Sequence, residues 1–341
     1  MKPRLSIIVV SWNSRADLAL CLPSLMAQTY TLVELIIVDN ASEDDSAEFV
    51  RQTYPAVRLI ENSDNVGFAA ATNQGFAAAT GDILIGLNPD TTVAPDWLNQ
   101  IVAAFDCDSV GLVTPRILQL DQPDQINACG NEPSLTGLTF CIGVNAPAHT
   151  YDAKPIQSVP AISGAAFAIS RACYEATGGF DGSYFTYYED TDLSFRARLA
   201  GFEIKLAPEA IVYHAYSFRM SPRKLYWIER NRHTTLIKCL RGRTLLRLSP
   251  ALLLGEAISW GFALLNGWRT VLAKAQAFVW VMRSYTLIER SAERDHDHRL
   301  IQEMVTHIRF DQATSPQLSR FLNRLCQPFL SLNKRIVLYL P

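Results

Sequence analysis

A buried strand that ends abruptly in a polar turn is the feature that most constrains the fold of this chain. Residues 81–87 form a near-continuous apolar run, which is typical of a strand buried on both faces of a parallel sheet. Asn88, Pro89 and Asp90 follow, and Pro89 cannot continue a hydrogen-bonded ladder. The sequence therefore predicts a carboxylate at the carboxyl end of a strand, where open α/β sheets bind their ligands.

Strands and helices alternate through the first part of the chain. The segments with strand character are 5–10, 34–39, 57–61, 81–87, 110–114, 163–169 and 203–213. Segments with helical spacing separate most of them, and this alternation predicts an α/β fold with a doubly wound, mostly parallel sheet and helices on both faces. Pro23 is expected to break the first helix. The proline-rich stretch 119–160 is expected to form loops and short strands.

The charge distribution divides the chain into two predicted domains. Residues 1–218 carry 11 Lys/Arg and 25 Asp/Glu, whereas residues 219–341 carry 20 Lys/Arg and 8 Asp/Glu. The acidic part suits a module that holds cations, and the basic part suits a helical region that faces an anionic surface. We expect that surface to be a membrane or an acceptor, and we expect no nucleic-acid partner.

Cysteines and apolar segments bear on the compartment. The seven cysteines form no C-x-x-C pair, and the N-terminal apolar run is too short for a signal peptide, so we expect a reducing cytoplasm. Residues 250–268 are apolar with one charge, Glu256, but Gly and Asn dilute the run. A helix packed on the first domain or lying in the membrane interface, a spanning helix, and a dimer contact all remain open.

Four ionisable residues stand at or just beyond the ends of predicted elements: Asp39, Asp90, Asp190 and His214. Each alone fits a helix cap or a surface residue. Together they resemble a hard-cation site, in which oxygen ligands and one imidazole hold Mg²⁺ or Mn²⁺. Such an ion usually binds substrate phosphates, which implies a nucleotide diphosphate ligand. Neither a P-loop nor a G-x-G-x-x-G motif is present.

The order of the motifs resembles that of the family 2 glycosyltransferases with the GT-A fold, in particular their rhamnosyltransferase-like branch. The resemblance covers about residues 4–218 and thins beyond Arg219. The matching segments are 6–13, 37–42, 65–68 with Asn73, 87–90, 178–181, 189–193 and 212–214.

This resemblance implies a role for each matching residue in donor binding. Asp39 would bind the pyrimidine base of a dTDP- or UDP-sugar, with Ser11 and Asn13 in the same pocket. Asp90 corresponds to the last carboxylate of the family's Asp-x-Asp metal motif, and His214 to a metal-binding histidine of some members. The residues that would surround the ribose and diphosphate are Asn65, Gly67, Phe68 and Asn73, together with Asn88, which replaces the first carboxylate of the metal motif.

The same resemblance assigns the catalytic residues. Asp190 matches the general base, and Glu189 and Asp192 would support it or contact the acceptor. We expect the partial positive charge of a helix start to keep Asp190 ionised. The aromatic loop 178–188 could close over the sugar and exclude water.

These expectations combine into an inverting glycosyltransferase. It would transfer a sugar such as rhamnose to a saccharide acceptor, lipid-linked in our reading, on the cytoplasmic face of a bacterial membrane, for cell-surface polysaccharide synthesis. One alternative is a non-catalytic nucleotide-sugar-binding component of a polysaccharide assembly complex. Another is a sugar nucleotidylyltransferase, whose Gly-rich basic signature is missing after Val10.

Overall fold

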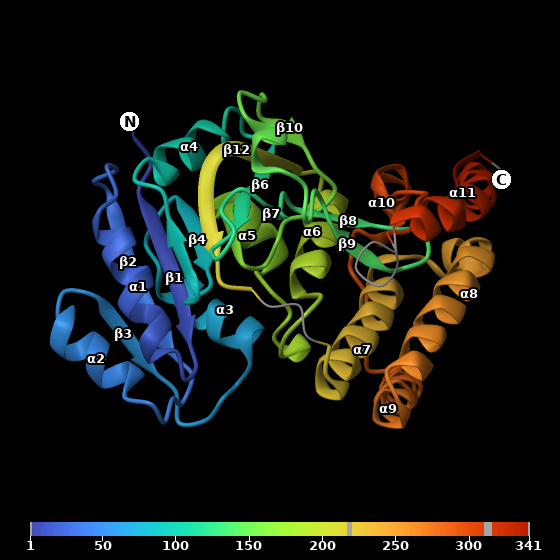
Figure 1. Ribbon diagram of the computed structural model, residues 1–341, viewed down its shortest axis with the longest axis horizontal. Helices are drawn as coiled ribbons and strands as arrows, with labels where there is room; N and C mark the ends of the chain where they lie inside the picture. Colours follow the sequence, from blue (N-terminus) through green and yellow to red (C-terminus); the bar gives the residue numbers. More distant parts are fainter. Residues whose placement is uncertain (1, 217–219, 310–315, 340–341) are drawn as a thin grey trace. The chain divides into compact units, whose positions relative to one another are not determined.

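Two compact units make up the chain. The computed structural model describes residues 2–216, 220–309 and 316–339 (Figure 1). Residues 1–131 and 141–218 form the first unit, and residues 132–140 and 219–341 form the second. The domain boundary predicted at residues 218 and 219 lies outside the described residues. The functional assignment of the two units stays a prediction.

A ten-stranded mixed sheet forms the first unit, with strands joined in the order β10-β12-β6-β11-β4-β1-β2-β3. β5 pairs with β12, and β7 pairs with β6. The strands β4, β1, β2 and β3 are parallel neighbours, β6 and β12 are parallel, and β11 runs antiparallel between β4 and β6. The strands are β1 Leu5–Ser11, β2 Val33–Asp39, β3 Arg58–Glu61, β4 Ile83–Leu87, β5 Thr91–Val93, β6 Val110–Gln119, β7 Ile126–Ala128, β10 Gln157–Ser158, β11 Ala166–Ser170 and β12 Glu203–His214.

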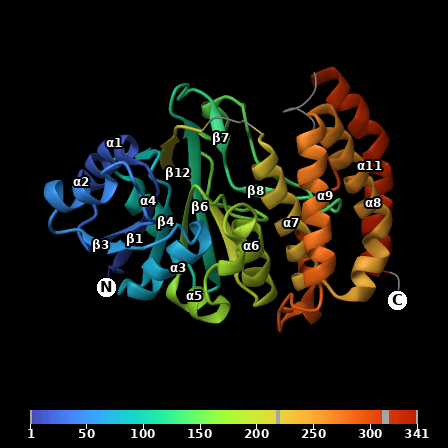
Figure 2. The same cartoon turned by 90° about the horizontal axis from the view of Figure 1, so that it is seen from below.

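Helices cover both faces of this sheet, as Figure 2 shows. The alternation of side chains along β1 explains why: Ile7 and Val9 pack in the core beneath α1, α2 and α4, whereas Ile8 and Val10 pack in the core beneath α3, α5 and α6. The predicted α/β fold is confirmed. The helices are α1 Arg15–Met26, α2 Ser46–Thr53, α3 Phe68–Ala78, α4 Trp97–Ala103, α5 Arg171–Thr177 and α6 Glu189–Leu199, with 3-10 turns η1 Ala148–Tyr151 and η2 Gly182–Tyr184.

The predicted break at Pro23 is wrong. α1 continues through Pro23 to Met26. A proline inside a helix costs about 3 kcal/mol or more. On either side of it, Cys21, Leu22 and Leu25 are buried in the core, and burying such side chains contributes about 1.5–3 kcal/mol each for the leucines. Packing therefore outweighs the lost hydrogen bond.

Residues 132–140 belong to the second unit, although the chain on either side of them belongs to the first. Strands β8 Asn131–Pro133 and β9 Thr139–Cys141 form a separate two-stranded sheet around residues 132–140. The backbone N–H of Leu135 donates to the carbonyl of Val305 at 3.1 Å. Within the second unit, a Cβ added at Gly255 would lie 2.2 Å from the carbonyl oxygen of Thr136, so a glycine is needed for this close approach.

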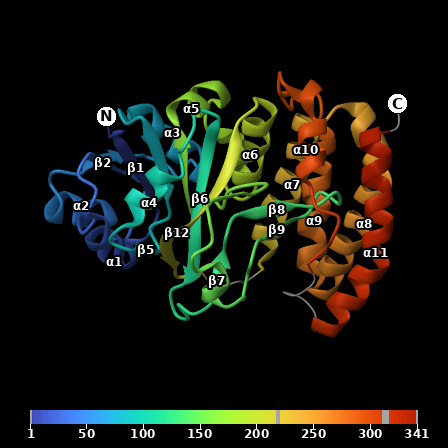
Figure 3. The ribbon, with the colours of Figure 1, turned by 90° about the horizontal axis from the view of Figure 1, so that it is seen from above.

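The second unit is helical, as predicted. α7, α8 and α9 pack on one another, and α11 packs on α8 and α10 (Figure 3). Among the described helices, α8 alone is long and apolar enough to cross a membrane by length and composition. The helices are α7 Pro222–Cys239, α8 Gly242–Leu265, α9 Trp268–Ser284, α10 His298–Glu303 and α11 Pro316–Tyr339, with the 3-10 turn η3 Arg294–His296.

Candidate active site

Three neighbouring strands bring several predicted residues to one edge of the sheet. β1 pairs in parallel with β2 so that Ser11 lies opposite Asp39. β1 also pairs in parallel with β4, so that Val9 lies opposite Leu87. Because residues 88–90 continue directly from β4, the polar turn leaves the sheet at the same edge as Ser11 and Asp39.

Asp39 and Ser11 each have a buried oxygen atom that makes no hydrogen bond to a described residue. Oδ2 of Asp39 accepts a hydrogen bond from the backbone N–H of Ser42 at 3.0 Å. Among the described residues, Oδ1 of Asp39 and Oγ of Ser11 are buried without a hydrogen-bond partner. An unsatisfied buried polar group costs about 1–3 kcal/mol, so both atoms suit a site whose ligand supplies the missing partner.

Asn13 shapes the adjacent loop. Its backbone is left-handed, with φ of 52°. Its side-chain Oδ1 accepts from the backbone N–H of Glu43 at 2.7 Å, and its own N–H donates to Oγ of Ser42 at 2.9 Å. These bonds tie the turn after β1 to the turn after β2, and the role of Asn13 in a nucleotide pocket stays a prediction.

Asn65, Gly67 and Phe68 form the entry to α3. Oδ1 of Asn65 accepts from Nδ2 of Asn40 and from the N–H of Gly67, both at 2.9 Å. Gly67 has φ of 87°, and a Cβ there would come within 2.7 Å of the Phe185 backbone, so only glycine fits. The N–H of Phe68 donates to the carbonyl of Phe185 at 2.6 Å. These contacts hold loop 178–188 against the turn at residues 65–67.

Asn73 acts on the same loop from α3. Its Nδ2 donates to the carbonyl of Phe180 at 2.6 Å, and its Oδ1 accepts from the N–H of Phe180 at 2.9 Å. The oxygen and the nitrogen of the Asn73 amide are therefore both hydrogen-bonded to the backbone of Phe180. Any contribution of Asn73 to a ligand pocket acts through the position of loop 178–188.

The two predicted metal ligands face each other. Nε2 of His214 lies 3.3 Å from Oδ1 of Asp90, and Nδ1 of His214 lies 3.1 Å from the amide oxygen of Asn127. Nδ1 is thus engaged by Asn127, and Nε2 is the ring nitrogen that faces Asp90. Oδ1 of Asp90 is buried and makes no hydrogen bond to any described residue. Two electron-pair donors that face each other fit a cation shared by both.

The predicted general base, Asp190, is held by several donors. Its Oδ2 accepts from Nδ2 of Asn131 at 2.9 Å and from the N–H of Gly164 at 3.0 Å. Its Oδ1 accepts from the N–H of Thr191 at 2.6 Å. Every one of these bonds favours the ionised carboxylate and fixes its orientation.

Burial opposes that preference. It raises the pKa of Asp190 above its ordinary value despite the hydrogen bonds. Burial also raises the pKa of the neighbouring Glu189 to about 8, and the charge of Asp190 adds to that increase. Loss of water thus acts against the helix dipole at Asp190, and the expectation that this carboxyl stays ionised stays a prediction. At neutral pH, Glu189 is protonated beside Asp190.

Asp192 has a supporting position. Its side chain is fully buried, and Oδ2 accepts from Nε of Arg196 at 2.7 Å. Its Oδ1 accepts from the hydroxyl of Tyr184 at 3.1 Å. Arg196 in turn donates to the carbonyls of Thr177 and Gly179. These contacts connect Asp192 to the aromatic loop, and the two roles expected for it, support of Asp190 or contact with an acceptor, stay predictions.

The segment Gly164–Ala165 connects the turn at residues 88–90 to Asp190. The N–H of Asn88 donates to the carbonyl of Ala165 at 2.9 Å, and the N–H of the preceding residue, Gly164, donates to Asp190. A Cβ added at Gly164 would lie 3.3 Å from Glu189 and 3.4 Å from Asp190. Consecutive residues of this segment thus position both groups.

Three residues of this arrangement were not predicted as site residues: Asn127, Asn131 and Gly164. Asn127 and Asn131 lie in the irregular stretch 119–160, where no periodicity marks them. Gly164 opens the small-residue run before β11, and a glycine beside a predicted strand was the available signal.

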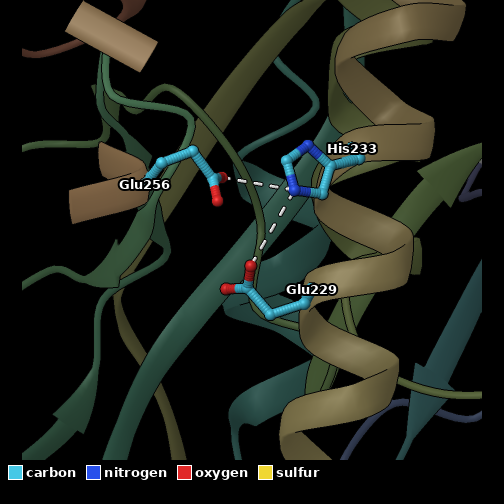
Figure 4. Close-up of side chains that lie close together, drawn as sticks. All are labelled: Glu229, His233 and Glu256. Atoms are coloured by element: carbon cyan, nitrogen blue, oxygen red, sulfur yellow. Dashed lines mark ion pairs between the residues drawn. The ribbon is translucent and has the colours of Figure 1, made fainter. Parts of the chain in front are cut away.

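A second group of ionisable side chains lies in the other unit and has the spacing of a metal site. Figure 4 shows Glu229, His233 and Glu256, with Nε2 of His233 3.3 Å from Glu256. Arg232 pairs with both carboxylates, at 2.7 Å from Glu229, and Lys274 also pairs with both, at 3.1 Å from Glu256. Two cations already neutralise the two carboxylates, so this cluster is a closed ion-pair network.

Comparisons with known proteins agree on one family. The family model described as "Glycosyl transferase family 2" matches residues 6–131, and the model described as "Glycosyl transferase family group 2" matches residues 83–290, more than half of the chain. An N-acetylglucosaminyl-diphospho-decaprenol L-rhamnosyltransferase of Mycobacterium tuberculosis is 28% identical over 232 residues, which is 62% of this chain and 75% of that protein. An uncharacterized protein of Sinorhizobium fredii is 30% identical over 62% of this chain but only 24% of its own length.

Solved structures give the same fold. GalNAc-T7, solved with UDP, GalNAc and Mn²⁺, matches with a TM-score of 0.57 at 18% identity, covering 70% of this chain and 48% of that chain. A mannosyltransferase from Pyrobaculum calidifontis, solved with GDP-Man and Mn²⁺, matches with a TM-score of 0.52 at 19% identity, covering 99% and 88%. With the family models, the GT-A fold and the relatives in agreement, the chain belongs to glycosyltransferase family 2.

Proposed function

We propose that this glycosyltransferase inverts the anomeric centre of a sugar that it transfers from a nucleotide diphosphate to a hydroxyl of a saccharide acceptor. The observation that carries the proposal is the attachment of Asn88 and Asp190 to consecutive residues, Ala165 and Gly164. This connection sets a fixed carboxylate beside the turn that carries Asp90, so one unit holds the groups for both halves of the transfer.

Asp190 acts as the general base in this proposal. It takes the proton of the acceptor hydroxyl while that oxygen bonds to the anomeric carbon, and the bond from that carbon to the diphosphate oxygen breaks. One base suffices for inversion, because the acceptor attacks opposite the leaving group. The raised pKa of Asp190 supports this role, since a carboxylate with a pKa nearer the working pH is a stronger base.

Asp90 and His214 would hold a divalent cation, Mg²⁺ or Mn²⁺, against the donor diphosphate. Support comes from the buried Oδ1 of Asp90, which makes no hydrogen bond to a described residue and faces His214, and from the Mn²⁺ present in the two similar solved structures. When bound, such an ion neutralises charge on the leaving phosphates as a Lewis acid. Asn127 would keep the His214 ring in the tautomer that leaves Nε2 available.

Asp39 and Ser11 would bind the nucleoside of the donor, a dTDP- or UDP-sugar. Their two buried, unpartnered oxygens accept or donate hydrogen bonds of the kind that a pyrimidine base and a ribose offer. Asn13, Asn65 and Gly67 shape the turns around them. Phe68 and Asn88 would lie near the ribose and diphosphate, and Asn73 would act on that pocket through the position of loop 178–188.

The acceptor is proposed to be a lipid-linked saccharide and the sugar to be rhamnose. The support is the 28% identical Mycobacterium tuberculosis relative, whose name states an L-rhamnosyl transfer to N-acetylglucosaminyl-diphospho-decaprenol. The excess of positive charge in residues 219–341 supports attachment to the anionic inner face of a cell membrane. Polysaccharide synthesis at that membrane would be the setting.

The experiment that tests the catalytic assignment compares Asp190→Asn with the parent protein. Asparagine keeps the size of the side chain and some of its hydrogen bonds but cannot take the proton. Turnover should fall by about 10²–10⁴-fold while donor-nucleotide affinity, measured by calorimetry, barely changes. Asp96→Asn, at the start of α4 and outside this site, is the control. If Asp190→Asn transfers sugar within a few-fold of the parent, the assignment is wrong and a binding module becomes the better reading.

A further inference from the structure

Most of the large apolar side chains that are exposed to solvent belong to the second unit. Of 23 large hydrophobic side chains that are exposed among the described residues, 16 lie beyond residue 240. They are Leu246, Leu253, Leu264, Leu265, Trp268, Leu272, Phe278, Val279, Met282, Tyr285, Leu287, Phe321, Leu325, Phe329, Leu332 and Tyr339. An apolar surface of this extent marks an interaction site.

The interior of the same unit contains paired charges beside its apolar side chains. Lys274 is 2% exposed and pairs with Glu229, which is also 2% exposed. Arg230 is buried between two indole rings, 4.5 Å from the centre of Trp227 and 4.4 Å from that of Trp280. Paired charges in the interior together with many exposed large apolar side chains are unusual in a water-soluble bundle, and they fit a bundle that contacts a hydrocarbon phase.

Helix α11 has three distinct faces. Leu330 and Asn333 form its buried face, and Nδ2 of Asn333 donates to the carbonyl of Arg247 on α8 at 2.9 Å. The spacings of four, seven and seven residues return to one side of an α-helix and give an exposed stripe of Phe321, Leu325, Leu332 and Tyr339. The helix contains no acidic residue and carries Arg320, Arg324, Lys334 and Arg335.

Helices α8 and α9 expose a second apolar surface at the turn that joins them. Leu265 is 90% exposed and Trp268 is 70% exposed, on either side of Asn266 and Gly267. Leu246, Leu253 and Leu264 lie on one exposed side of α8, because their spacings of seven and eleven residues fit the helical period. α8 packs against both α9 and α11 (Figure 3), so neighbouring helices carry these stripes.

We propose that the exposed stripes of α8, α9 and α11 contact the lipid of a bilayer that contains anionic headgroups. This deepens the membrane attachment suggested above, on which it rests, by naming the contact elements. Apolar side chains would enter the boundary between headgroups and acyl chains, and the exposed Arg324 and Arg335 of α11 would meet the headgroup phosphates. The buried ion pairs would keep the charges of α7 and α9 away from lipid.

Charge argues for a bilayer over a second copy of the chain. Residues 219–341 carry 20 Lys/Arg against 8 Asp/Glu. A symmetric dimer through this face would set the same patch on both partners, so the basic side chains of α11 would lie against each other. An anionic leaflet neutralises them instead. The positive charge and the exposed apolar side chains thus both favour an anionic bilayer as the partner of this surface.

The test is flotation of the full-length protein with vesicles of phosphatidylcholine alone or mixed with phosphatidylglycerol. The parent should float with both and more strongly with the anionic vesicles. Leu265→Glu in the α8–α9 turn and Leu325→Glu on α11 should each weaken the binding at least about tenfold, the effect of removing one buried leucine side chain. Leu20→Glu replaces a leucine of the first unit that is as exposed as Leu325, at 60% against 61%, and this matched control should bind like the parent.

Circular dichroism confirms that each exposed substitution leaves the fold intact. Asp190→Asn should float like the parent, since flotation needs neither donor nor acceptor; loss of sugar transfer and loss of membrane contact can thus be told apart. Unchanged flotation of both glutamate variants would overturn the proposal. So would a parent that ignores vesicles and forms a dimer by light scattering that either substitution dissolves, because a second copy would then cover this face.

Discussion

Replacement of Glu189 by glutamine should stabilise the first unit at alkaline pH. The pKa of Glu189 rises from 4.5 to about 8 in the folded protein, first through burial and then through the charge of Asp190. Because the folded state holds the proton more tightly, it loses stability as the pH rises through the range between the two values. At 1.36 kcal/mol per pKa unit, a shift of about 3.5 corresponds to about 5 kcal/mol. The carboxyls share that shift, so we expect a loss of about 2–5 kcal/mol in the parent.

Glutamine has no charged form to desolvate, so the Glu189→Gln protein should lack this loss. Below about pH 4.5 the glutamic acid is neutral in both states, and the two proteins should be nearly equally stable there. Above about pH 8 the variant should be the more stable protein. The prediction thus has a sign that reverses the usual expectation that a buried substitution destabilises.

Hydrogen exchange of the β1 and β4 amides, measured from about pH 5 to about pH 9 with correction for the intrinsic exchange rate, reports the opening of the first unit separately from the second. Glu43→Gln, which changes an exposed carboxyl of the same unit, is the control and should follow the parent. Parallel stability curves for the parent and Glu189→Gln over the whole range would refute the burial argument, because a carboxyl with an ordinary pKa contributes no slope above pH 6.

Three further outcomes are expected. Asp90→Ala should remove the difference in UDP or dTDP affinity between Mn²⁺ and EDTA, which calorimetry measures; an affinity that never depended on metal would contradict the cation site. Asn131→Ala should move the acidic limb of the pH–rate profile upward by about one to two units, because a hydrogen bond to a charged group contributes about 1.5–3 kcal/mol. Glu229→Gln should destabilise the second unit by about 3–5 kcal/mol in urea at pH 7. Neighbouring cations lower the pKa of Glu229 to about 2, so this loss should shrink as the pH falls from 4.5 toward 2.

The sequence predicts the first unit well where local patterns decide the structure. Apolar runs that stop at a polar residue mark β1, β2 and β4, and parallel pairing then sets Ser11 opposite Asp39. The same reasoning places Asp90 at the edge of the sheet. Pairing of Asp90 with His214, 124 positions later, follows from the β5–β12 ladder, in which Thr91 lies opposite His214.

Long-range contacts decide what the sequence could not predict. Asn131 donates to a carboxylate 59 residues away, from a stretch without periodicity. Residues 132–140 leave the sheet to pair with the second unit, because Leu135 and Glu132 find their partners at Val305 and His307. The sequence of residues 219–341 predicts that this region is helical, but it does not predict which side of each helix is exposed.

Four of the predicted site residues carry a buried oxygen that makes no hydrogen bond within the described part of the chain. Ser11, Asp39, Asp90 and Glu189 each have a buried oxygen without a hydrogen-bond partner among the described residues. Such atoms cost stability, so isosteric replacement there should raise the free energy of unfolding or leave it unchanged while activity falls. Asp192 belongs to a satisfied network, and its replacement should lower the free energy of unfolding and activity together. Measured on the same variants, the sign of the stability change therefore distinguishes a site residue with an unused buried oxygen from one in a satisfied network, without knowledge of the sugar.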